Sequence, residues 1–259
     1  MKRNFTFRRC PMKTVLSLLL LLSTVSLSVL PARAEKLVIH GSSTTMGKIM
    51  SKIKEPFEKG TGIQLELLAN GSGAGAKDLA AGSCEAAMGS ESLEDLKKAV
   101  KELGGIPNLV EHVLAQDTMK VIVNKQNPVS KLSREQLKGL NTGKIKNWKE
   151  VGGPDADVIV VTSVKGSGTR SFFSKTIMDG EQYAADAVEA STTMAEIKEV
   201  ATMKEAIGAV SDSFVNDTVK TVDGPPITRP LIFVTKGEPS PGIKKLIDFI
   251  RGEGQKYLK

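Results

Sequence analysis

Three short clusters of glycine, serine and threonine are the residues of this sequence best suited to holding a small ligand. They are Gly41-Ser42-Ser43-Thr44-Thr45, Gly71-Ser72-Gly73-Ala74-Gly75 and Gly166-Ser167-Gly168-Thr169. N–H groups at the start of a helix lack partners, the helix dipole adds partial positive charge there, and glycine allows close approach of the backbone. Serine and threonine hydroxyls add further donors. One such cluster is typical of a turn with a helix N-cap, but three of them predict a shared site for a small oxyanion.

Each cluster follows an apolar run and precedes a segment with helical periodicity. Such runs predict strands at 36–40, 63–69, 85–89, 119–124, 158–162, 206–210 and 231–235. Helices are predicted at 46–59, 74–81, 93–103, 134–140, 169–178, 192–203 and 241–251. This alternation is typical of an α/β protein with mostly parallel sheets. Because ligands of open α/β sheets bind beyond the carboxyl ends of the strands, we expect the three clusters to converge there.

The first 34 residues have the features of a secretory signal peptide. A basic start, an apolar stretch from Thr14 to Leu30 and the small-residue sequence Ala32-Arg33-Ala34 fit export and cleavage before Glu35. This segment holds six of the 36 Lys and Arg residues, which leaves 30 against 29 Asp and Glu in the exported chain. Near-neutral charge argues against nucleic-acid binding. Cys84 is then the only cysteine, so the exported chain has no internal disulfide.

Two changes of composition predict a discontinuous first lobe around an inserted second one. An apolar strand runs into Asn127-Pro128, and the stretch 211–228 is rich in Asp, Asn and Gly and contains Pro225-Pro226. We therefore expect a signal peptide at 1–34, the first part of lobe 1 at 35–117, lobe 2 at 118–215 and the return segment of lobe 1 at 216–259. Two clusters then come from the first lobe and one from the second, and they face each other across a cleft.

The order of these motifs resembles the phosphate-binding proteins of bacterial phosphate ABC transporters. The resemblance covers nearly all of the exported chain; besides the three clusters it rests on Asn127-Pro128-Val129, Gly143-Lys144-Ile145-Lys146-Asn147-Trp148, Ala206-Ile207-Gly208 and Arg229-Pro230-Leu231. It implies a two-lobed periplasmic-binding-protein fold of type II, in which each lobe has its own mostly parallel sheet flanked by helices and the ligand cleft lies between the lobes. It also implies a periplasmic protein, expected to be a monomer, that closes on one inorganic phosphate and delivers it to a membrane permease. No cofactor, no metal and no chemistry on the ligand are expected.

The resemblance also implies which residues bind the anion. Ser43, Thr44 and Thr45 correspond to the first loop of the family and Ser72 to its second; Ser167, Gly168 and Thr169 correspond to the third. Glu91 stands where members with an acid use the carboxylate to accept a hydrogen bond from a protonated phosphate oxygen. Fully ionised sulfate offers no such proton, so this acceptor favours phosphate. A solvated carboxylate at a helix start is the alternative for Glu91.

One departure from the family pattern bears on specificity. Many members have an arginine four residues before the serine of the third loop, where this chain has Ser163. The loss removes a bidentate, charge-assisted contact to the anion, for which Lys165 or Arg170 could substitute. Two alternatives to phosphate capture therefore stay open. One is another oxyanion such as molybdate, tungstate or sulfate, and the other is a sensory or interaction protein with a degenerate cleft.

An enzyme is not expected from the same residues. A Gly-x-Ser-x-Gly turn is absent around Ser167, and no histidine follows it in the sequence, whereas the triad histidine of α/β hydrolases comes last. His40 and His112 have no partners at metal-ligand spacing, and we expect both to be structural.

Overall fold

The computed structural model describes residues 1–2 and 35–258, and the predicted signal peptide lies outside the described residues apart from its first two positions. The strands are β1 (Lys36–Gly41), β2 (Gln64–Leu68), β3 (Ala86–Gly89), β4 (Leu109–Asn124), β5 (Ile159–Ser163), β6 (Val188–Ala190), β7 (Ala206–Ser211) and β8 (Val219–Lys236). Along the described part of the chain, no helix is both long and apolar enough to span a bilayer.

The helices alternate with the strands as predicted. They are α1 (Ser43–Thr45), α2 (Ser51–Thr61), α3 (Ser72–Ala81), α4 (Leu93–Ala99), α5 (Arg134–Thr142), α6 (Gly168–Ile177), α7 (Thr193–Thr202), α8 (Pro241–Arg251) and α9 (Gln255–Leu258). A π-helical segment, η1 (Met46–Met50), joins α1 to α2, and short 3₁₀ segments are η2 (Lys101–Gly105), η3 (Trp148–Val151) and η4 (Asp212–Phe214). The fold class expected from the sequence is confirmed.

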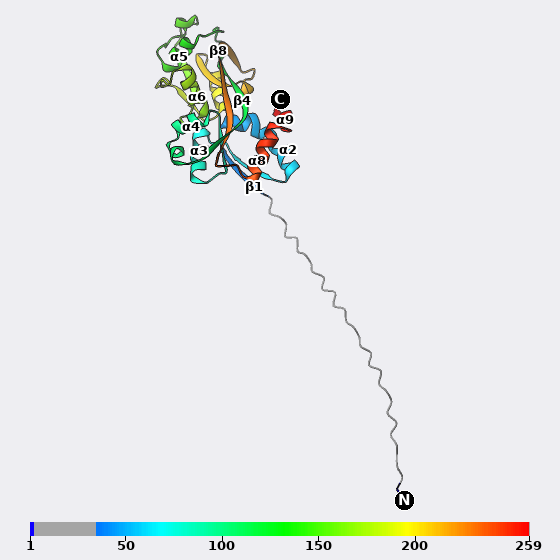
Figure 1. Cartoon of the computed structure of the whole chain (residues 1–259). Coiled ribbons are helices and arrows are strands. Elements are labelled where there is room, and N and C mark those ends of the chain that lie inside the picture. The colour runs from blue at the N-terminus through cyan, green and yellow to red at the C-terminus, as the bar shows by residue number, and fades with distance from the viewer. Residues whose placement is uncertain (3–34, 259) are drawn as a thin grey trace. The chain divides into compact units, whose positions relative to one another are not determined.

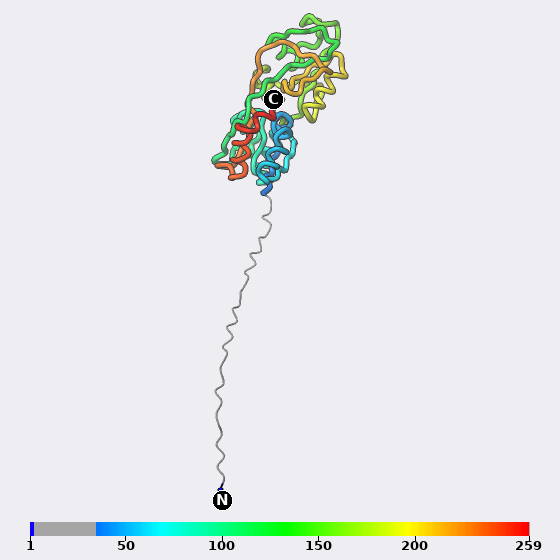
Figure 2. Tube along the Cα trace, turned by 90° about the vertical axis from the view of Figure 1, so that its right-hand side faces the viewer, coloured from blue at the N-terminus to red at the C-terminus, as the bar shows by residue number. Residues whose placement is uncertain are grey.

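One sheet of eight strands runs through both lobes in the order β2-β1-β3-β8-β4-β7-β5-β6. Strands β2, β1 and β3 are parallel to one another, as are β7, β5 and β6. Between these groups, β8 and β4 pair antiparallel over most of their length. They run lengthwise through the molecule in two perpendicular views (Figures 1 and 2). The two lobes therefore share one hydrogen-bonded sheet, where we expected a separate sheet in each.

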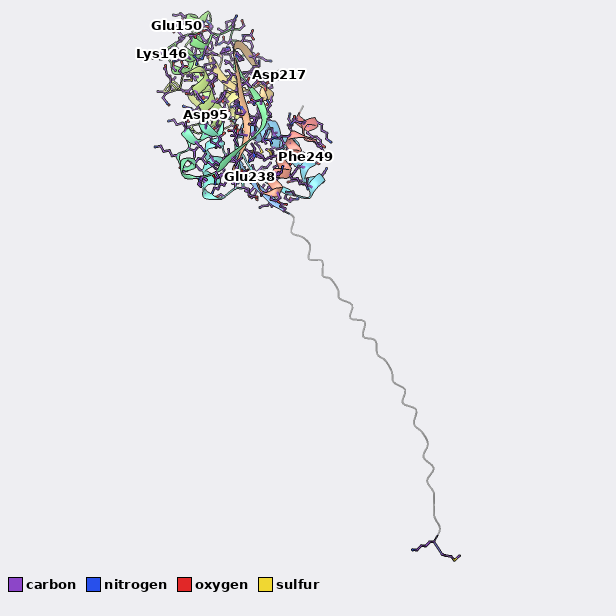
Figure 3. The ribbon with its side chains drawn as sticks, viewed as in Figure 1. Asp95, Lys146, Glu150, Asp217, Glu238 and Phe249 are labelled. Carbon is purple, nitrogen blue, oxygen red and sulfur yellow. The ribbon has the colours of Figure 1, made fainter. Side chains whose placement is uncertain are left out.

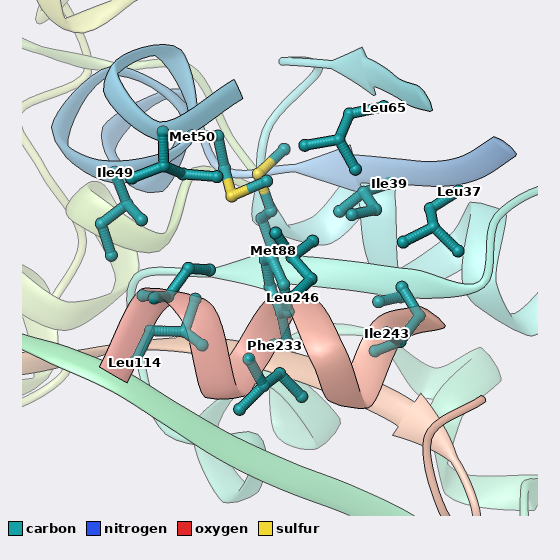
Figure 4. Close-up of a cluster of buried hydrophobic side chains, with 14 of the residues drawn as sticks. Leu37, Ile39, Ile49, Met50, Leu65, Met88, Leu114, Phe233, Ile243 and Leu246 are labelled. Carbon is teal, nitrogen blue, oxygen red and sulfur yellow. The ribbon is translucent and has the colours of Figure 1, made fainter. Parts of the chain in front are cut away.

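Helices cover both faces of the sheet in each lobe. In the first lobe, α2 and α8 pack on one face and α3 and α4 on the other. The apolar side of α8 is clear in Figure 4, where Ile243 and Leu246 lie against Met88 and Phe233 of the sheet. Ser240 caps this helix through the Ile243 N–H, which fixes where it begins. In the second lobe, α5 and α6 pack on one face and α7 on the other.

The core packing shows where the chain changes lobe. Leu114 belongs to the core of the first lobe and Met119 to that of the second, while Ile227 packs in the second and Leu231 in the first. The crossing in β4 lies close to the expected boundary at 117/118. Packing places the return crossing between residues 227 and 231, further along the chain than the expected boundary at 215/216. The lobe division itself stays a prediction.

Candidate functional site

The first predicted loop forms the start of a helix at the end of β1. Ser42 is the N-cap of α1, and its hydroxyl accepts from the Thr45 N–H at 3.2 Å. Thr45 donates its hydroxyl to the Gly89 carbonyl at 2.8 Å, so both donors of Thr45 are used within the protein. The Thr44 hydroxyl is 3.5 Å from that of Thr169, on the other lobe. Ser43 is half-buried at the first position of α1.

The second loop presents a buried hydroxyl without a partner. Ser72 begins α3 and is 1 % exposed. Its hydroxyl is close enough to the Glu91 carboxyl to lower that group's pKa, yet no described group lies in hydrogen-bonding geometry with it. Gly75, one turn later, allows the loop to pack closely: a Cβ there would lie 2.6 Å from the His40 carbonyl oxygen. A buried hydroxyl left unpaired in this way points to a ligand.

The third loop meets the other two directly. Ser167 is the N-cap residue of α6 but makes no side-chain cap, and Thr169 is 6 % exposed in the first turn. The Gly73 N–H donates to the Gly166 carbonyl across the lobes at 3.0 Å. The structure therefore brings together loops that are about 30 to 125 residues apart in the sequence and places the lobes in a closed arrangement.

Arg229 lies at the centre of this convergence, and the sequence analysis did not assign it to the site. It is fully buried on β8; its guanidinium donates to Thr169 Oγ1 at 2.8 Å and to Thr44 Oγ1 at 3.4 Å. One arginine thus reaches a hydroxyl from each lobe. The signal in the sequence was an arginine two residues before the predicted strand 231–235, where a charge that is buried needs a partner.

Asp117 holds this arginine from the neighbouring strand. The two residues are paired in the β4–β8 register, and Arg229 Nε donates to Asp117 Oδ2 at 2.9 Å. Asp117 is also fully buried; its Oδ1 accepts from Lys48 Nζ at 2.7 Å and from Ser211 Oγ at 2.6 Å. Lys48 further donates to Asp212, on η4 of the second lobe, at 3.2 Å. The two cations of this cluster, Lys48 and Arg229, are therefore matched by two carboxylates, Asp117 and Asp212.

Glu91 is buried against the third loop. It is 2 % exposed, and the Ser90 N–H donates to its Oε2 at 2.8 Å. A Cβ on Gly168 would overlap this carboxylate oxygen and lie 2.5 Å from Ser90 Oγ, so only glycine fits at the start of α6. Burial raises the pKa of Glu91 to about 7 against the opposing effect of the Ser90 N–H.

A second buried glutamate, Glu196, was not singled out in the sequence. It lies in the first turn of α7, where Ser163 Oγ donates to its Oε2 at 2.9 Å and the Ala209 N–H to its Oε1 at 3.0 Å. Burial raises its pKa to about 7, opposed by these two donors. The Ser163 hydroxyl is therefore used in a hydrogen bond to Glu196. Arg170 donates to Glu189 and to the Ser163 carbonyl, and Lys165 is exposed.

The remaining candidates for chemistry have structural partners. His40 pairs with Asp78 at 2.8 Å, and His112 with Thr235 at 2.9 Å. Burial raises the pKa of the Cys84 thiol to about 11, which keeps it from acting as a nucleophile at neutral pH. Among the described residues, no group of three or more His, Cys, Asp or Glu side chains could hold a metal ion.

Comparison with known proteins identifies the family to which this chain belongs. The sequence model of the PBP superfamily domain matches residues 30–253. The chain is 30% identical over 232 residues to the phosphate-binding protein PstS of Bacillus subtilis, across 84% of this chain and 75% of that protein. A putative phosphate ABC transporter substrate-binding protein from Clostridium perfringens, solved with bound phosphate, is 30% identical with a TM-score of 0.77, over 86% of this chain and 96% of that one.

A third relative is an ABC-type phosphate transport receptor from Vibrio cholerae, with a TM-score of 0.68 and 28% identity over 86% of this chain and 96% of that one. The resemblance inferred from the ordered motifs is therefore confirmed by sequence and by structure. The chain belongs to the PBP superfamily and, within it, to the family of PstS-like phosphate-binding proteins.

Proposed function

We propose that this chain is a substrate-binding protein that captures inorganic phosphate between its lobes and delivers it to an ABC transporter permease. The observation that carries the proposal is the position of Arg229, a fully buried cation that donates to Thr44 of the first loop and to Thr169 of the third. The second loop contacts the third through the Gly73 N–H. A small oxyanion is the ligand that such a set of donors fits, because backbone N–H groups, hydroxyls and a guanidinium all stabilise negative charge. No reaction on the ligand is part of this proposal.

Each predicted residue has a proposed part in binding. Thr44, Ser72 and Thr169 donate hydroxyl hydrogen bonds to the anion, and Ser43, Ser167 and Gly168 supply N–H groups of helix starts. Thr45 supports the first loop through Gly89. Glu91 accepts a hydrogen bond from a protonated phosphate oxygen. Arg229 is proposed to supply the guanidinium that the family has at the position of Ser163.

Opening of the cleft is proposed to occur about the two long strands. Only β4 and β8 carry the backbone from one lobe core to the other, so the crossings at 115–119 and 227–231 are the places where rotation would occur. Asp117 and Arg229 face each other at these crossings. Closure then brings Thr44 and Thr169 to the same guanidinium, so that the ligand links both lobes.

Export across the inner membrane and docking on a permease belong to the same proposal. The predicted signal peptide falls outside the described residues, and its cleavage before Glu35 stays a prediction. Monomeric behaviour stays a prediction as well. Mass spectrometry of the secreted protein tests the cleavage site, and light scattering tests the oligomeric state.

Titration calorimetry of residues 35–259 with phosphate, sulfate and molybdate tests the binding proposal. We expect one phosphate site per chain and a rise in melting temperature, since the ligand binds only the folded state. Ser72→Ala should weaken binding by about 1–3 kcal/mol, the worth of a hydrogen bond to a charged partner. Ser83→Ala, an exposed serine just after α3, is the matched control and should bind like the wild type.

The outcome also decides between the alternatives. A melting curve that millimolar phosphate leaves unmoved, while molybdate or sulfate shifts it, would assign the site to another oxyanion. No response to any anion would favour a sensory or interaction protein with a degenerate cleft. Equal losses for Ser72→Ala and Ser83→Ala would remove the second loop from the site.

A further inference from the structure

Lys48 is a second cation at the edge of the proposed anion site. It lies on η1, shortly after Thr45 of the first loop. Its Nζ donates to Asp117 Oδ1 at 2.7 Å and to Asp212 Oδ1 at 3.2 Å. The Lys48 side chain is 20 % exposed, and ion pairs that are partly withdrawn from water are screened less than pairs on an open surface. Both contacts can therefore contribute to the energy of the closed arrangement.

The two partners of Lys48 lie in different parts of the molecule. η1 belongs to the first lobe, because Ile49 is buried in the core of that lobe. Asp212 begins η4 directly after β7, and Phe214 of η4 packs against a core cluster of the second lobe. Asp117 is on β4, where this strand passes from one core to the other. Lys48 thus links the first lobe both to the crossing strand and to the second lobe.

Asp117 connects this link to Arg229. Its Oδ1 accepts from Lys48 and, at 2.6 Å, from Ser211 of β7, and its Oδ2 accepts from Arg229 Nε at 2.9 Å. The guanidinium is held at Nε, and its two terminal nitrogens donate to hydroxyls of the third and first loops. Because hydrogen bonds to a supporting residue restrict its orientation, groups from both lobes fix the direction of this guanidinium.

An apolar contact joins the same two segments. A Cβ on Gly47 would lie 2.5 Å from Phe214 Cζ, so the ring packs directly on the backbone of η1. We call the contacts of Gly47 and Lys48 with Asp212 and Phe214 the η1–η4 junction. The π-helical form of η1 is rare in proteins and is frequent at functional sites. Two independent contacts, one ionic and one apolar, therefore lie between the lobes beside the first loop.

Rotation about the two crossings would separate this junction. β7 pairs with β4 from Met119 onward, so η4 moves with the second lobe, whereas η1 moves with the first. We propose that Lys48 is a positioning residue for phosphate binding: its ion pair with Asp212 forms when the lobes close, and through Asp117 it then holds Arg229 against the anion. This proposal rests on the phosphate function proposed above.

The charges of the cluster allow a test by the sign of an effect. Lys48 and Arg229 are matched by Asp117 and Asp212, so a bound dianion adds negative charge to a balanced cluster. If Asp212 acted through its charge alone, its loss would leave the site more positive, and phosphate would bind more tightly. If Asp212 holds the closed lobes through Lys48, its loss weakens binding. The two roles therefore predict changes in opposite directions.

Dissociation of radiolabelled phosphate from residues 35–259, chased with unlabelled phosphate, measures the lifetime of the closed state, and calorimetry measures Kd. Asp212→Ala removes one partly exposed ion pair and should raise the dissociation rate about two- to fivefold. The association rate, obtained from the dissociation rate and Kd, should stay within about twofold of the wild type. Asp217→Ala, which removes an exposed charge in the turn before β8, is the matched control and should dissociate like the wild type.

Variants of Lys48 test the bridge itself. Lys48→Met should raise the dissociation rate about tenfold, more than Asp212→Ala, because Asp117 loses a donor as well. Lys48→Arg can still donate to both carboxylates and should restore most of the wild-type lifetime. Adding Asp212→Ala to Lys48→Met should cause no further loss, because the contact between them is already absent.

Gly47→Ala perturbs the junction without a change of charge. The added Cβ displaces the Phe214 ring in the closed protein, so phosphate should dissociate faster than from the wild type. Gly60→Ala, in α2 of the same lobe, places its Cβ in open space and is the matched control. Asp212→Ala and Gly47→Ala report on the junction even if Lys48→Met does not fold.

Three outcomes overturn the proposal. Unchanged or tighter binding in Asp212→Ala would mean that the ion pair is present in the open protein as well, or acts through charge alone. Weaker binding that comes from slower association would make Lys48 and Asp212 part of electrostatic steering. Losses that multiply in the double variant would show that the two residues act independently. A folded wild type that gives no phosphate heat refutes the phosphate function itself.

Discussion

Because Glu196 is buried, we predict how the free energy of unfolding of the ligand-free protein depends on pH. The pKa of Glu196 is raised from 4.5 to about 7 in the folded protein. Between these values the native state binds more protons than the unfolded state, so the free energy of unfolding must fall as pH rises from about 4.5 to 7 and then level off. At 1.36 kcal/mol per pKa unit, the shift corresponds to a loss of about 3 kcal/mol.

Replacing Glu196 with glutamine removes this titration while keeping the side-chain shape. At pH 5 the two proteins should have similar stabilities, because wild-type Glu196 is then protonated and neutral like glutamine. At pH 8 the variant should be more stable relative to the wild type than at pH 5, by about 3 kcal/mol. Glu91 titrates in both proteins, so its contribution cancels in the difference.

Urea unfolding in phosphate-free buffers, followed by circular dichroism and by the fluorescence of buried Trp148, measures the difference. Glu199→Gln should follow the wild type at both pH values, since it is on the same helix and is partly exposed. A change in relative stability below about 0.5 kcal/mol between pH 5 and 8 would refute the reasoning. It would mean that Glu196 is solvated or paired in solution.

Four further predictions concern closure and selectivity. Arg229→Lys keeps the charge but loses the fork that spans both lobes, so phosphate binding measured by calorimetry should weaken about 10- to 100-fold, and an unchanged Kd would exclude Arg229 from the site. Glu91→Gln should reduce the preference for phosphate over sulfate at least about tenfold in competition titrations; an unchanged ratio would make Glu91 structural. Gly168→Ala should hinder closure, because its Cβ would overlap the Glu91 carboxylate; the free protein should melt normally, whereas phosphate should no longer reduce the radius of gyration in X-ray scattering. Lys175→Ala breaks the ion pair between the exposed Lys175 and Asp95 of the other lobe, and should lower affinity at most about fivefold; Asp95 is labelled in Figure 3.

Local signals explain why most elements were predictable. All seven predicted helices occur close to their expected positions, and each of the seven predicted strands overlaps an observed strand, because apolar periodicity and capping residues act over a few neighbouring positions. Ser133 and Ser240, for example, cap α5 and α8 where polar residues precede the predicted helices. β6 has only three residues, Val188–Ala190, which is too short to carry a strand pattern.

The long strands β4 and β8 were only partly predicted because their polar residues face each other. β4 begins at Leu109, ten residues before the expected start, and β8 begins at Val219 within a stretch read as a boundary. Polar residues such as Asp117 and Thr118 interrupt the apolar pattern, but they lie opposite Arg229 and Thr228 on the neighbouring strand. Pairing between segments about 110 residues apart leaves no trace in local composition.

The sequence by itself determined the α/β fold, the family and the three donor loops, because each depends on short motifs in a fixed order. Only the tertiary structure decided which charges lie at the site. Arg229, Asp117 and Lys48 meet through pairing of β4 with β8 and packing of η1, and Glu196 is buried by the docking of α7 on the sheet. The physical reason is that the charge state of a side chain is set by desolvation and by partners distant in sequence, which residue type and spacing do not specify.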